Sequence, residues 1–112
     1  MDLDFQAGFK RIVEKLAEAG EDYADKKADS WYKQEMKGPI LAALMSKIEG
    51  SVAHRESVAK ASEDYKKYLE ETREAIRAEG KAKSEYKKWD ASFEANRSLS
   101  SLEKRIINNI GE

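Results

Sequence analysis

Residues 61–96, ASEDYKKYLEETREAIRAEGKAKSEYKKWDASFEAN, decide the expected fold of this 112-residue chain. Small, aromatic and polar side chains recur in this stretch at alternating steps of four and three, which keeps them in one heptad register. The positions of that register are Ala61, Tyr65, Tyr68, Thr72, Ala75, Glu79, Ala82, Tyr86, Trp89, Phe93 and Asn96. Because leucine and isoleucine are missing from them, the pattern predicts a long helix that packs against a helix of unlike character.

The first third of the chain carries an apolar stripe of its own. Its residues also recur at steps of four and three, so they line one face of a helix expected over residues 4–36. That face comprises Phe5, Phe9, Ile12, Leu16, Ala19 and Tyr23, and it is expected to continue through Ala24, Ala28 and Trp31 to Met36. Pro39, the only proline, predicts a helix stop and restart ahead of a second helix over residues 40–97. Gly50 and Gly80 are the candidate breaks within that second helix.

The end of the chain predicts a short third helix over residues 99–110. Ser100 and Glu103 have the spacing of a capping box, and they precede an apolar stripe. The stripe consists of Leu102, Ile106, Ile107 and Ile110. It could pack back on the other helices or contact another subunit. The expected fold is therefore all-α: a single helical domain over residues 1–112, built as a long antiparallel helical hairpin or coiled coil with a short C-terminal helix.

Charge dominates the composition without giving the chain a net charge. Charged residues make up 38% of the sequence, yet the formal net charge is only -1. Ala, Glu, Lys, Leu and Arg account for more than half of the chain, which is typical of long or coiled-coil helices. Because few Leu, Ile, Val and Phe are available for a monomeric core, we expect a homo-oligomer. The expected oligomer seam is Tyr65, Tyr68, Ala75, Ala82, Tyr86, Trp89 and Phe93.

Several function classes find no support in the residues. There is no Cys, and His54, the one histidine, has no second histidine three or four positions away. The chain also has no Gly-rich phosphate loop, so we expect no enzyme, no catalytic residue, no metal site and no cofactor. No apolar run approaches the ~18 residues of a membrane span, and the N-terminus is acidic where a signal peptide is basic. The expected location is the cytoplasm, that of a bacterial host if a phage encodes the protein.

Nucleic-acid binding is the best-supported chemistry. Cations are interleaved with aromatic residues between residues 66 and 97, and such a mixture suits the phosphates and unpaired bases of a single strand. The candidate residues are Arg73, Lys81, Lys83, Lys87, Lys88, Trp89 and Arg97. Nine acidic residues between residues 63 and 94 match the nine cations of this stretch in number, and the aromatic residues also fit the packing seam. Only over residues 81–88 do cations clearly outnumber acids, by four to one.

A second candidate surface is acidic. It comprises Glu18, Glu21, Asp22, Asp25 and Asp29 on the exposed side of the first predicted helix. Such a run is most often a solvated helix face, and the alternative is a docking surface for a protein partner. The acidic and basic stretches could recruit partners, or they could pair with each other across the hairpin.

Part of the chain resembles small helical proteins of tailed phages and prophages that are encoded near recombination or early genes. The residues that carry this likeness are Tyr65 to Leu69, then Arg73, Ala75, Arg77, Ala78, Ala82, Glu85, Tyr86 and Trp89, and finally Phe93 to Ser101. The resemblance covers about residues 52–105, and the nearest described type is the UvsY-type recombination mediator. It implies a helical oligomer that loads a recombinase onto single-stranded DNA, with Arg73, Lys83, Lys87, Lys88 and Arg97 as the positions to test.

Three hypotheses follow for the function. The first is a non-enzymatic phage-type accessory protein that oligomerises and binds single-stranded DNA, a recombinase or both. The second is a phage protein-interaction module that inhibits a host defence or repair enzyme through the acidic surface. The third is a structural or assembly oligomer, for which a large homogeneous assembly without DNA is the discriminating result.

Overall fold

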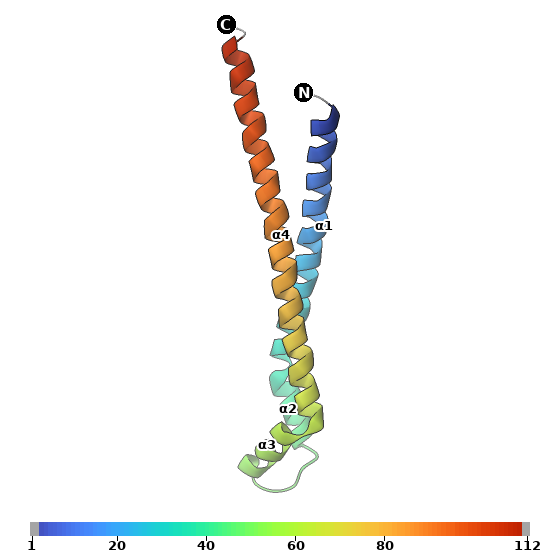
Figure 1. Ribbon diagram of the computed structural model, residues 1–112. Coiled ribbons are helices and arrows are strands. Elements are labelled where there is room, and N and C mark those ends of the chain that lie inside the picture. The colour runs from blue at the N-terminus through green and yellow to red at the C-terminus, as the bar shows by residue number, and fades with distance from the viewer. Residues whose placement is uncertain (1–2, 111–112) are drawn as a thin grey trace. The chain divides into compact units, whose positions relative to one another are not determined.

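The computed structural model describes residues 3–110, which are almost entirely helical (Figure 1). The helices are α1 (Leu3–Glu35), α2 (Lys37–Met45), α3 (Val52–Ala61) and α4 (Glu63–Ile110). No strand occurs over this range. The all-α class and the long helices predicted from the sequence are confirmed.

The chain divides into two compact units, and α1 and α4 contribute to both. The terminal unit combines Met1–Tyr23 with Lys81–Glu112, and the central unit is Ala24–Gly80. In the terminal unit the rings of Phe9 and Phe93 are 5.7 Å apart, and those of Tyr23 and Tyr86 are 5.9 Å apart. The contact nearer the start of α1 lies nearer the end of α4, so the two helices pack antiparallel in this unit. The prediction of a single domain over the whole chain stays a prediction.

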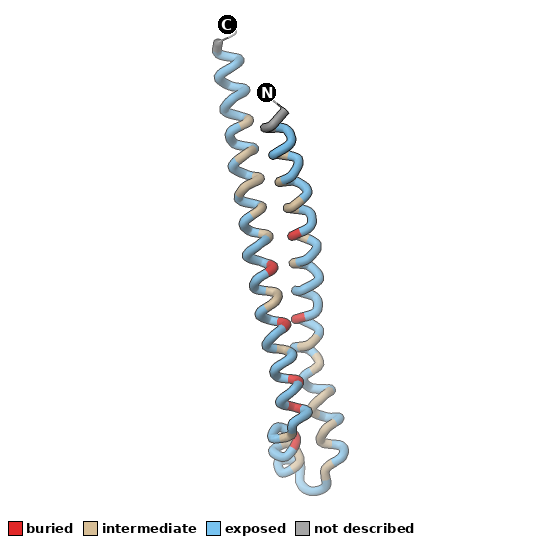
Figure 2. The backbone as a smooth tube through the Cα atoms, turned by 45° about the vertical axis from the view of Figure 1, so that its right-hand side comes forward, coloured by how far each residue is buried: buried red, intermediate tan, exposed pale blue. Residues whose placement is uncertain are grey.

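The predicted heptad register of α4 matches the observed burial. In the central unit Tyr65, Tyr68 and Ala75 are buried. In the terminal unit Ala82 is buried, and the aromatic residues further along are half-buried. Figure 2 shows the buried residues of α4 recurring along the helix at intervals. Contacts within one chain therefore explain this burial, and the expected role of the seam in an oligomer stays a prediction.

The stripe on α1 is confirmed from Phe9 to Tyr23 and is wrong at the next three positions. Phe9, Ile12, Leu16 and Tyr23 are half-buried and Ala19 is buried, whereas Ala24, Ala28 and Trp31 are exposed. Met36 is again half-buried, and the side chain of Phe5 lies outside the described residues. In the central unit the buried residue of α1 is Ser30 instead. One residue of displacement turns a side chain by about 100° around a helix, so a stripe shifted by one position faces solvent. The apolar character of Trp31 did not decide its position.

Two short breaks separate the first three helices, and both were predicted from the sequence. Met36 alone lies between α1 and α2, and Pro39 lies in the first turn of α2, where its missing N–H costs little. The break near Gly50 is also confirmed, because α2 ends at Met45 and α3 begins at Val52. Arg55 of α3 reaches back to α2, where its Nε donates to the Met45 carbonyl at 3.1 Å.

Ser62 marks a break that the sequence analysis missed. Its hydroxyl donates to the Ala59 carbonyl at 2.6 Å and accepts from the Tyr65 amide at 3.2 Å. One side chain therefore satisfies a terminal carbonyl of α3 and a terminal amide of α4. Glu63 and Asp64 follow in the first turn of α4, where acidic side chains stabilise the positive end of the helix dipole.

Two predictions about α4 are wrong. The helix continues through Gly80, and it continues through Ser98 to Ser101 up to Ile110, so there is no separate helix over residues 99–110. A single glycine costs a helix about 1 kcal/mol, and serine costs less. Extending an existing helix gains a hydrogen bond for each added residue without a new nucleation step. The capping-box spacing of Ser100 and Glu103 therefore lies inside a continuing helix.

Over the described range, none of the helices combines the length and the apolar character that a membrane crossing requires.

Candidate nucleic-acid interface

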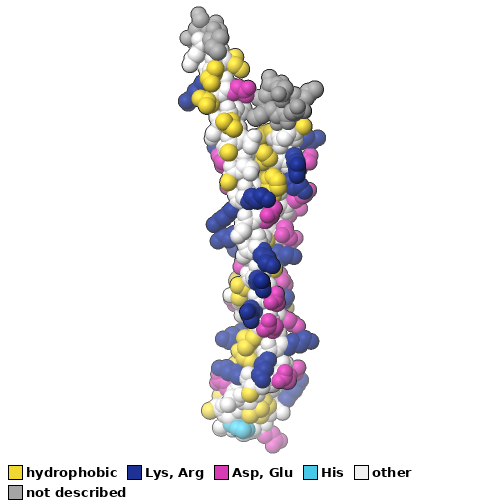
Figure 3. All heavy atoms as spheres, viewed as in Figure 1, with side chains coloured by type: hydrophobic (Ala, Val, Ile, Leu, Met, Phe, Trp, Pro, Cys, Tyr) yellow, Lys and Arg dark blue, Asp and Glu magenta, His cyan; other side chains and the backbone are white. Residues whose placement is uncertain are grey.

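The terminal unit presents a basic segment on α4, consisting of Lys81, Lys83, Lys87 and Lys88. All four residues are exposed. The first three make no ion pair within the part of the chain that the structure describes, and Lys88 Nζ lies 3.9 Å from Glu85 Oε1. Figure 3 shows cationic side chains spaced along the visible face of α4. The predicted lysines are therefore available to an anionic partner.

The heptad register explains why these lysines face solvent. Ala82, Tyr86 and Trp89 occupy the packed side of α4, and each residue step turns the helix by about 100°. The lysines therefore point to the sides of the helix or away from α1. Glu85 is the one acid over residues 81–88, and its carboxylate is already bound to neighbours on α4. The basic segment keeps a positive local charge although the whole chain is nearly neutral.

The aromatic residues pack between the helices of the terminal unit. Phe93 stacks on Phe9, and Tyr86 packs against Tyr23. The indole Nε1 of Trp89 donates to Glu85 Oε1 at 2.9 Å, and Lys88 Nζ lies 5.1 Å from the centroid of the same indole. The ring contacts place Tyr86 and Phe93 in the packing seam, whereas the named contacts of the half-buried Trp89 are to Glu85 and Lys88 of α4 itself. Because the rings of Tyr86 and Phe93 are packed, phosphate contacts by the lysines are the main chemistry that the segment offers.

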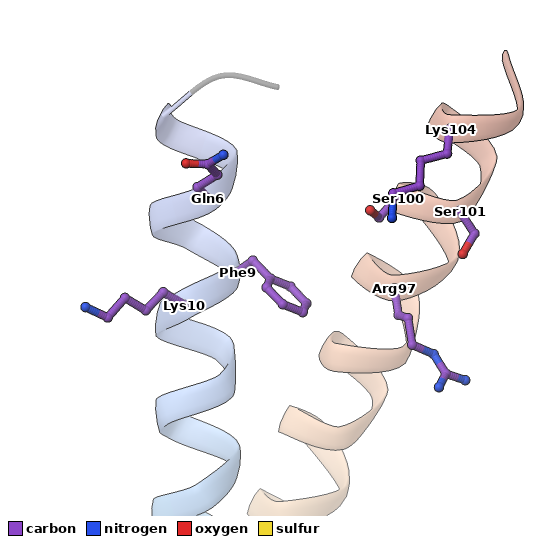
Figure 4. A pocket seen from close by; sticks show the side chains of 7 residues that line it. All are labelled: Gln6, Phe9, Lys10, Arg97, Ser100, Ser101 and Lys104. Atoms are coloured by element: carbon purple, nitrogen blue, oxygen red, sulfur yellow. The ribbon is translucent and has the colours of Figure 1, made fainter. Parts of the chain in front are cut away.

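Arg97 lies at a hollow in the terminal unit, here named the end hollow. Its volume is about 350 Å³, and it is lined by Gln6, Phe9 and Lys10 of α1 and by Arg97, Ser100, Ser101 and Lys104 of α4. Figure 4 shows the Phe9 ring pointing from α1 toward α4, with Ser100 and Lys104 on the side of α4 nearer α1. Lys10 extends to the far side of α1 in the same view. Arg97 also extends away from α1, so Lys104 is the lining cation that this view shows on the side of the hollow.

Most residues of the end hollow were missed by the sequence analysis. Gln6 and Lys10 are one helical turn apart, and Ser100 and Ser101 each lie about one turn from both Arg97 and Lys104. That spacing was the available signal, and it needed the correct pairing of α1 with α4 to become informative. Because the sequence analysis expected a break at residues 98–101, it did not treat Arg97 and Lys104 as residues of one continuous helix.

Arg73 does not join the basic segment of the terminal unit. It belongs to the central unit, where it is exposed and its Nη1 lies 3.9 Å from Glu70 Oε1. The structure thus groups Lys81, Lys83, Lys87, Lys88, Trp89 and Arg97 in one unit and places Arg73 in the other.

The acidic surface predicted on α1 is exposed at all five positions, but it is divided between the units. Glu18, Glu21 and Asp22 lie in the terminal unit, whereas Asp25 and Asp29 lie in the central unit. Glu18 pairs with Lys15 at 3.4 Å and Asp29 pairs with Lys33 at 3.3 Å. In the central unit Asp29 also lines a hollow that the sequence analysis missed, whose other lining residues are Lys26, Lys33, Glu70, Glu71, Glu74, Ala75 and Ala78.

His54 has a local structural role. Its backbone amide donates to Ser51 Oγ at 3.2 Å, which caps the start of α3. Within residues 3–110 no group of three or more His, Asp or Glu side chains is arranged to hold a metal ion. The candidate chemistry of the described residues is therefore charge recognition.

Comparisons with protein-family models, curated proteins and solved structures found no match to the chain. The function is accordingly argued from side chains alone. The features that carry it are the basic segment and the end hollow, which belong to the same unit.

Proposed function

We propose that the protein is a non-enzymatic accessory protein that binds single-stranded DNA through the basic segment of α4. The observation that carries the proposal is the exposure of Lys81, Lys83 and Lys87 without an ion-pair partner among the described residues. A lysine already paired with a carboxylate must give up that partner to bind a phosphate. An unpaired lysine has no protein partner to give up, so its binding only releases counterions condensed on the DNA. This release favours association at low salt.

The proposed interaction is with the sugar-phosphate backbone. The aromatic residues of the terminal unit pack against one another, which supports electrostatic contact over base stacking. Binding should therefore show little sequence preference and a strong dependence on salt. With four lysines engaged, the slope of log affinity against log salt is about -3 for a single strand.

The resemblance to UvsY-type mediators adds a recombinase as a second proposed partner. The resemblance covers residues 52–105, which include the whole basic segment. A recombination mediator must hold DNA and deliver it to another protein, so DNA binding through α4 is the part of that role which the side chains support. A phage origin is part of the same proposal and rests on the resemblance alone.

The first prediction concerns two lysines of the basic segment. Replacing Lys83 and Lys87 by alanine should weaken binding to a fluorescent oligo-dT several-fold at 50 mM salt and make the salt slope less steep by about 1.4. Fluorescence anisotropy over a series of salt concentrations measures both quantities. The matched control replaces Lys37 and Lys47, two exposed lysines of the central unit, and removes the same charge.

The two variants separate local binding from a general effect of charge. Equal losses in both variants would show that only net charge matters and would remove the basic segment from the proposal. Affinity that does not depend on salt would contradict electrostatic binding altogether. Circular dichroism confirms that each variant keeps its helices before the affinities are compared.

A protein partner is the second candidate, favoured by the acidic hollow of the central unit. Asp29 of α1 and Glu70, Glu71 and Glu74 of α4 line this hollow, and a partner with a basic segment would complement them. Replacing Glu70 and Glu74 by lysine should abolish capture of that partner and leave DNA affinity unchanged or higher. The opposite pattern would assign the main function to the basic segment.

A further inference from the structure

The end hollow has a composition that packing between α1 and α4 does not explain. Of its seven lining residues three are cationic, three are neutral and polar, and one is aromatic. Five of the seven are exposed, while Phe9 and Ser100 are half-buried, so the hollow is open to solvent. Figure 4 shows Phe9 of α1 and Ser100 and Lys104 of α4 on the sides of their helices that face the hollow, whereas Lys10, Arg97 and Ser101 extend away from it. An aromatic ring opposite hydrogen-bond donors is an arrangement that can hold a ligand.

The charge of the hollow selects an anion. Arg97 Nη2 lies 2.9 Å from Glu94 Oε2, and Lys10 Nζ lies 4.0 Å from Glu14 Oε1, in both cases within one helix. Lys104 makes no ion pair within residues 3–110. The first two contacts are exposed pairs that contribute little to stability, so both side chains can turn to a ligand at small cost. Ser100, Ser101 and Gln6 add donors for the oxygen atoms of an anion.

The aromatic wall indicates that the anion carries a flat ring. Phe9 stacks on Phe93 and also lines the hollow, so it remains in place by packing while part of its surface stays accessible. A nucleobase stacked on an aromatic ring contributes about 1–3 kcal/mol to binding single strands. The volume of about 350 Å³ lies within the range of small-molecule sites.

We propose that the end hollow binds the terminal phosphate of a nucleotide, with the base against Phe9 and the phosphate held by Lys104, Ser100 and Arg97. A terminal phosphate carries a charge of about -1.5 to -2 at pH 7, against -1 for an internal phosphodiester, and so is attracted more strongly by Lys104 and by Arg97 once that side chain turns toward the hollow. The nucleotide is either the end of a DNA strand or a free mononucleotide. The strand-end form rests on the proposed function, and the mononucleotide form does not.

The test compares oligo-dT with and without a 5′-phosphate, together with thymidine monophosphate and inorganic phosphate as free probes. The wild-type protein should bind the phosphorylated strand at least threefold more tightly. Lys104→Ala should lose this advantage and keep the affinity for the unphosphorylated strand. Arg105→Ala is the matched control, since it removes an adjacent cation of α4 that does not line the end hollow. Amide chemical shifts of Ser100 and Ser101 report occupation of the site.

Each outcome decides between the two sources or rejects the site. A preference for the 5′-phosphate that disappears in Lys104→Ala alone supports the strand end. Binding of thymidine monophosphate at Ser100 and Ser101, without any binding of oligo-dT, supports the mononucleotide and rejects the proposed function. Equal affinity for both strands and no shift with the free probes would overturn the end hollow while leaving the basic segment untouched. Shifts with inorganic phosphate alone would remove the role of Phe9.

Discussion

Gly50 is the residue whose conformation most constrains the connection between α2 and α3. Its φ of +120° lies in a region that side chains with a Cβ rarely adopt. A Cβ at this position would also lie 2.9 Å from Cδ2 of His54. The sequence identified Gly50 as a break, but only the structure shows that both its backbone angle and the histidine require glycine there.

Replacing Gly50 by alanine should lower the free energy of unfolding by about 1–3 kcal/mol because of the strained backbone. Urea unfolding followed by circular dichroism measures the change. Gly80→Ala is the matched control: a Cβ there meets nothing within 4 Å, and the position lies inside α4. That variant should be more stable by up to about 1 kcal/mol. Destabilisation of both variants to the same extent would contradict this account of Gly50.

Ser30 shows how a polar residue takes a buried position in the central unit. It is fully buried, and its hydroxyl accepts from Gln34 Nε2 at 3.0 Å. On the partner helix the Tyr68 hydroxyl donates to the Lys33 carbonyl. Both polar groups are therefore satisfied, which removes most of the cost of burying them. Sequence reasoning ranked Trp31 above Ser30 because hydropathy does not record such hydrogen bonds.

At the scale of the element, α3 is a short helix held by local contacts. Ser51 caps its start, Ser62 caps its end, and Lys60 Nζ lies 2.7 Å from Glu56 Oε1 across one turn. An acid followed four residues later by a base is a spacing at which helical side chains pair. The hydrogen bond from Lys60, together with its positive charge, holds the pKa of Glu56 below 4.5.

The pair leads to a prediction about pH. Because the pKa of Glu56 is lowered on folding, its stabilising contribution is present above about pH 4.5 and is lost as the pH falls through the lowered value. Carbon-detected NMR titration of the Glu56 carboxyl should give a pKa that rises toward 4.5 in Lys60→Gln. Lys47→Gln, which removes a lysine outside α3, should leave it unchanged. An unchanged pKa in Lys60→Gln would show that the ion pair does not form in solution.

The length of α4 follows from cooperativity rather than from local signals. Gly80 and the serines at residues 98–101 are weak helix formers, so a reading by local propensity divides the helix there. Once the buried positions Ala75 and Ala82 fix the turns on either side of Gly80, continuing the helix costs less than ending it. Sequence signals for helix ends are therefore informative near Pro39 and Gly50 and misleading at Ser100.

At the scale of the whole molecule, the apolar residues near the end of α4 have no partner among the described residues. Leu99, Leu102, Ile106 and Ile107 are 58%, 53%, 50% and 62% exposed. The sequence left two choices for this stripe, packing back on the chain or contact with another subunit. Among the described residues the structure does not show packing back, and the side chain of Ile110, the last residue of the predicted stripe, lies outside them. We therefore propose self-association through the exposed residues. Burying such side chains is worth about 1.5–3 kcal/mol each when complete.

We therefore expect the molar mass to rise with concentration. Sedimentation equilibrium from about 5 to 200 μM measures it, and Leu102→Glu with Ile106→Glu should return the protein to the monomer mass. Ile76→Glu, which alters an apolar residue of the central unit that is 45% exposed, is the control and should leave the association unchanged. A monomer mass for the wild type over the whole range would reject this interface.

The sequence alone determined the helical class, the heptad register of α4 and the positions of Lys81, Lys83, Lys87 and Lys88. These properties depend on periodicity, which can be counted along the sequence because each residue turns an α-helix by the same angle. Tertiary structure decided that Ser30 is buried instead of Trp31, that the aromatic residues pack, and that Gln6 and Lys104 share one hollow. Such features depend on which turn of α1 faces which turn of α4, and that alignment is fixed only when the side chains of both helices pack together.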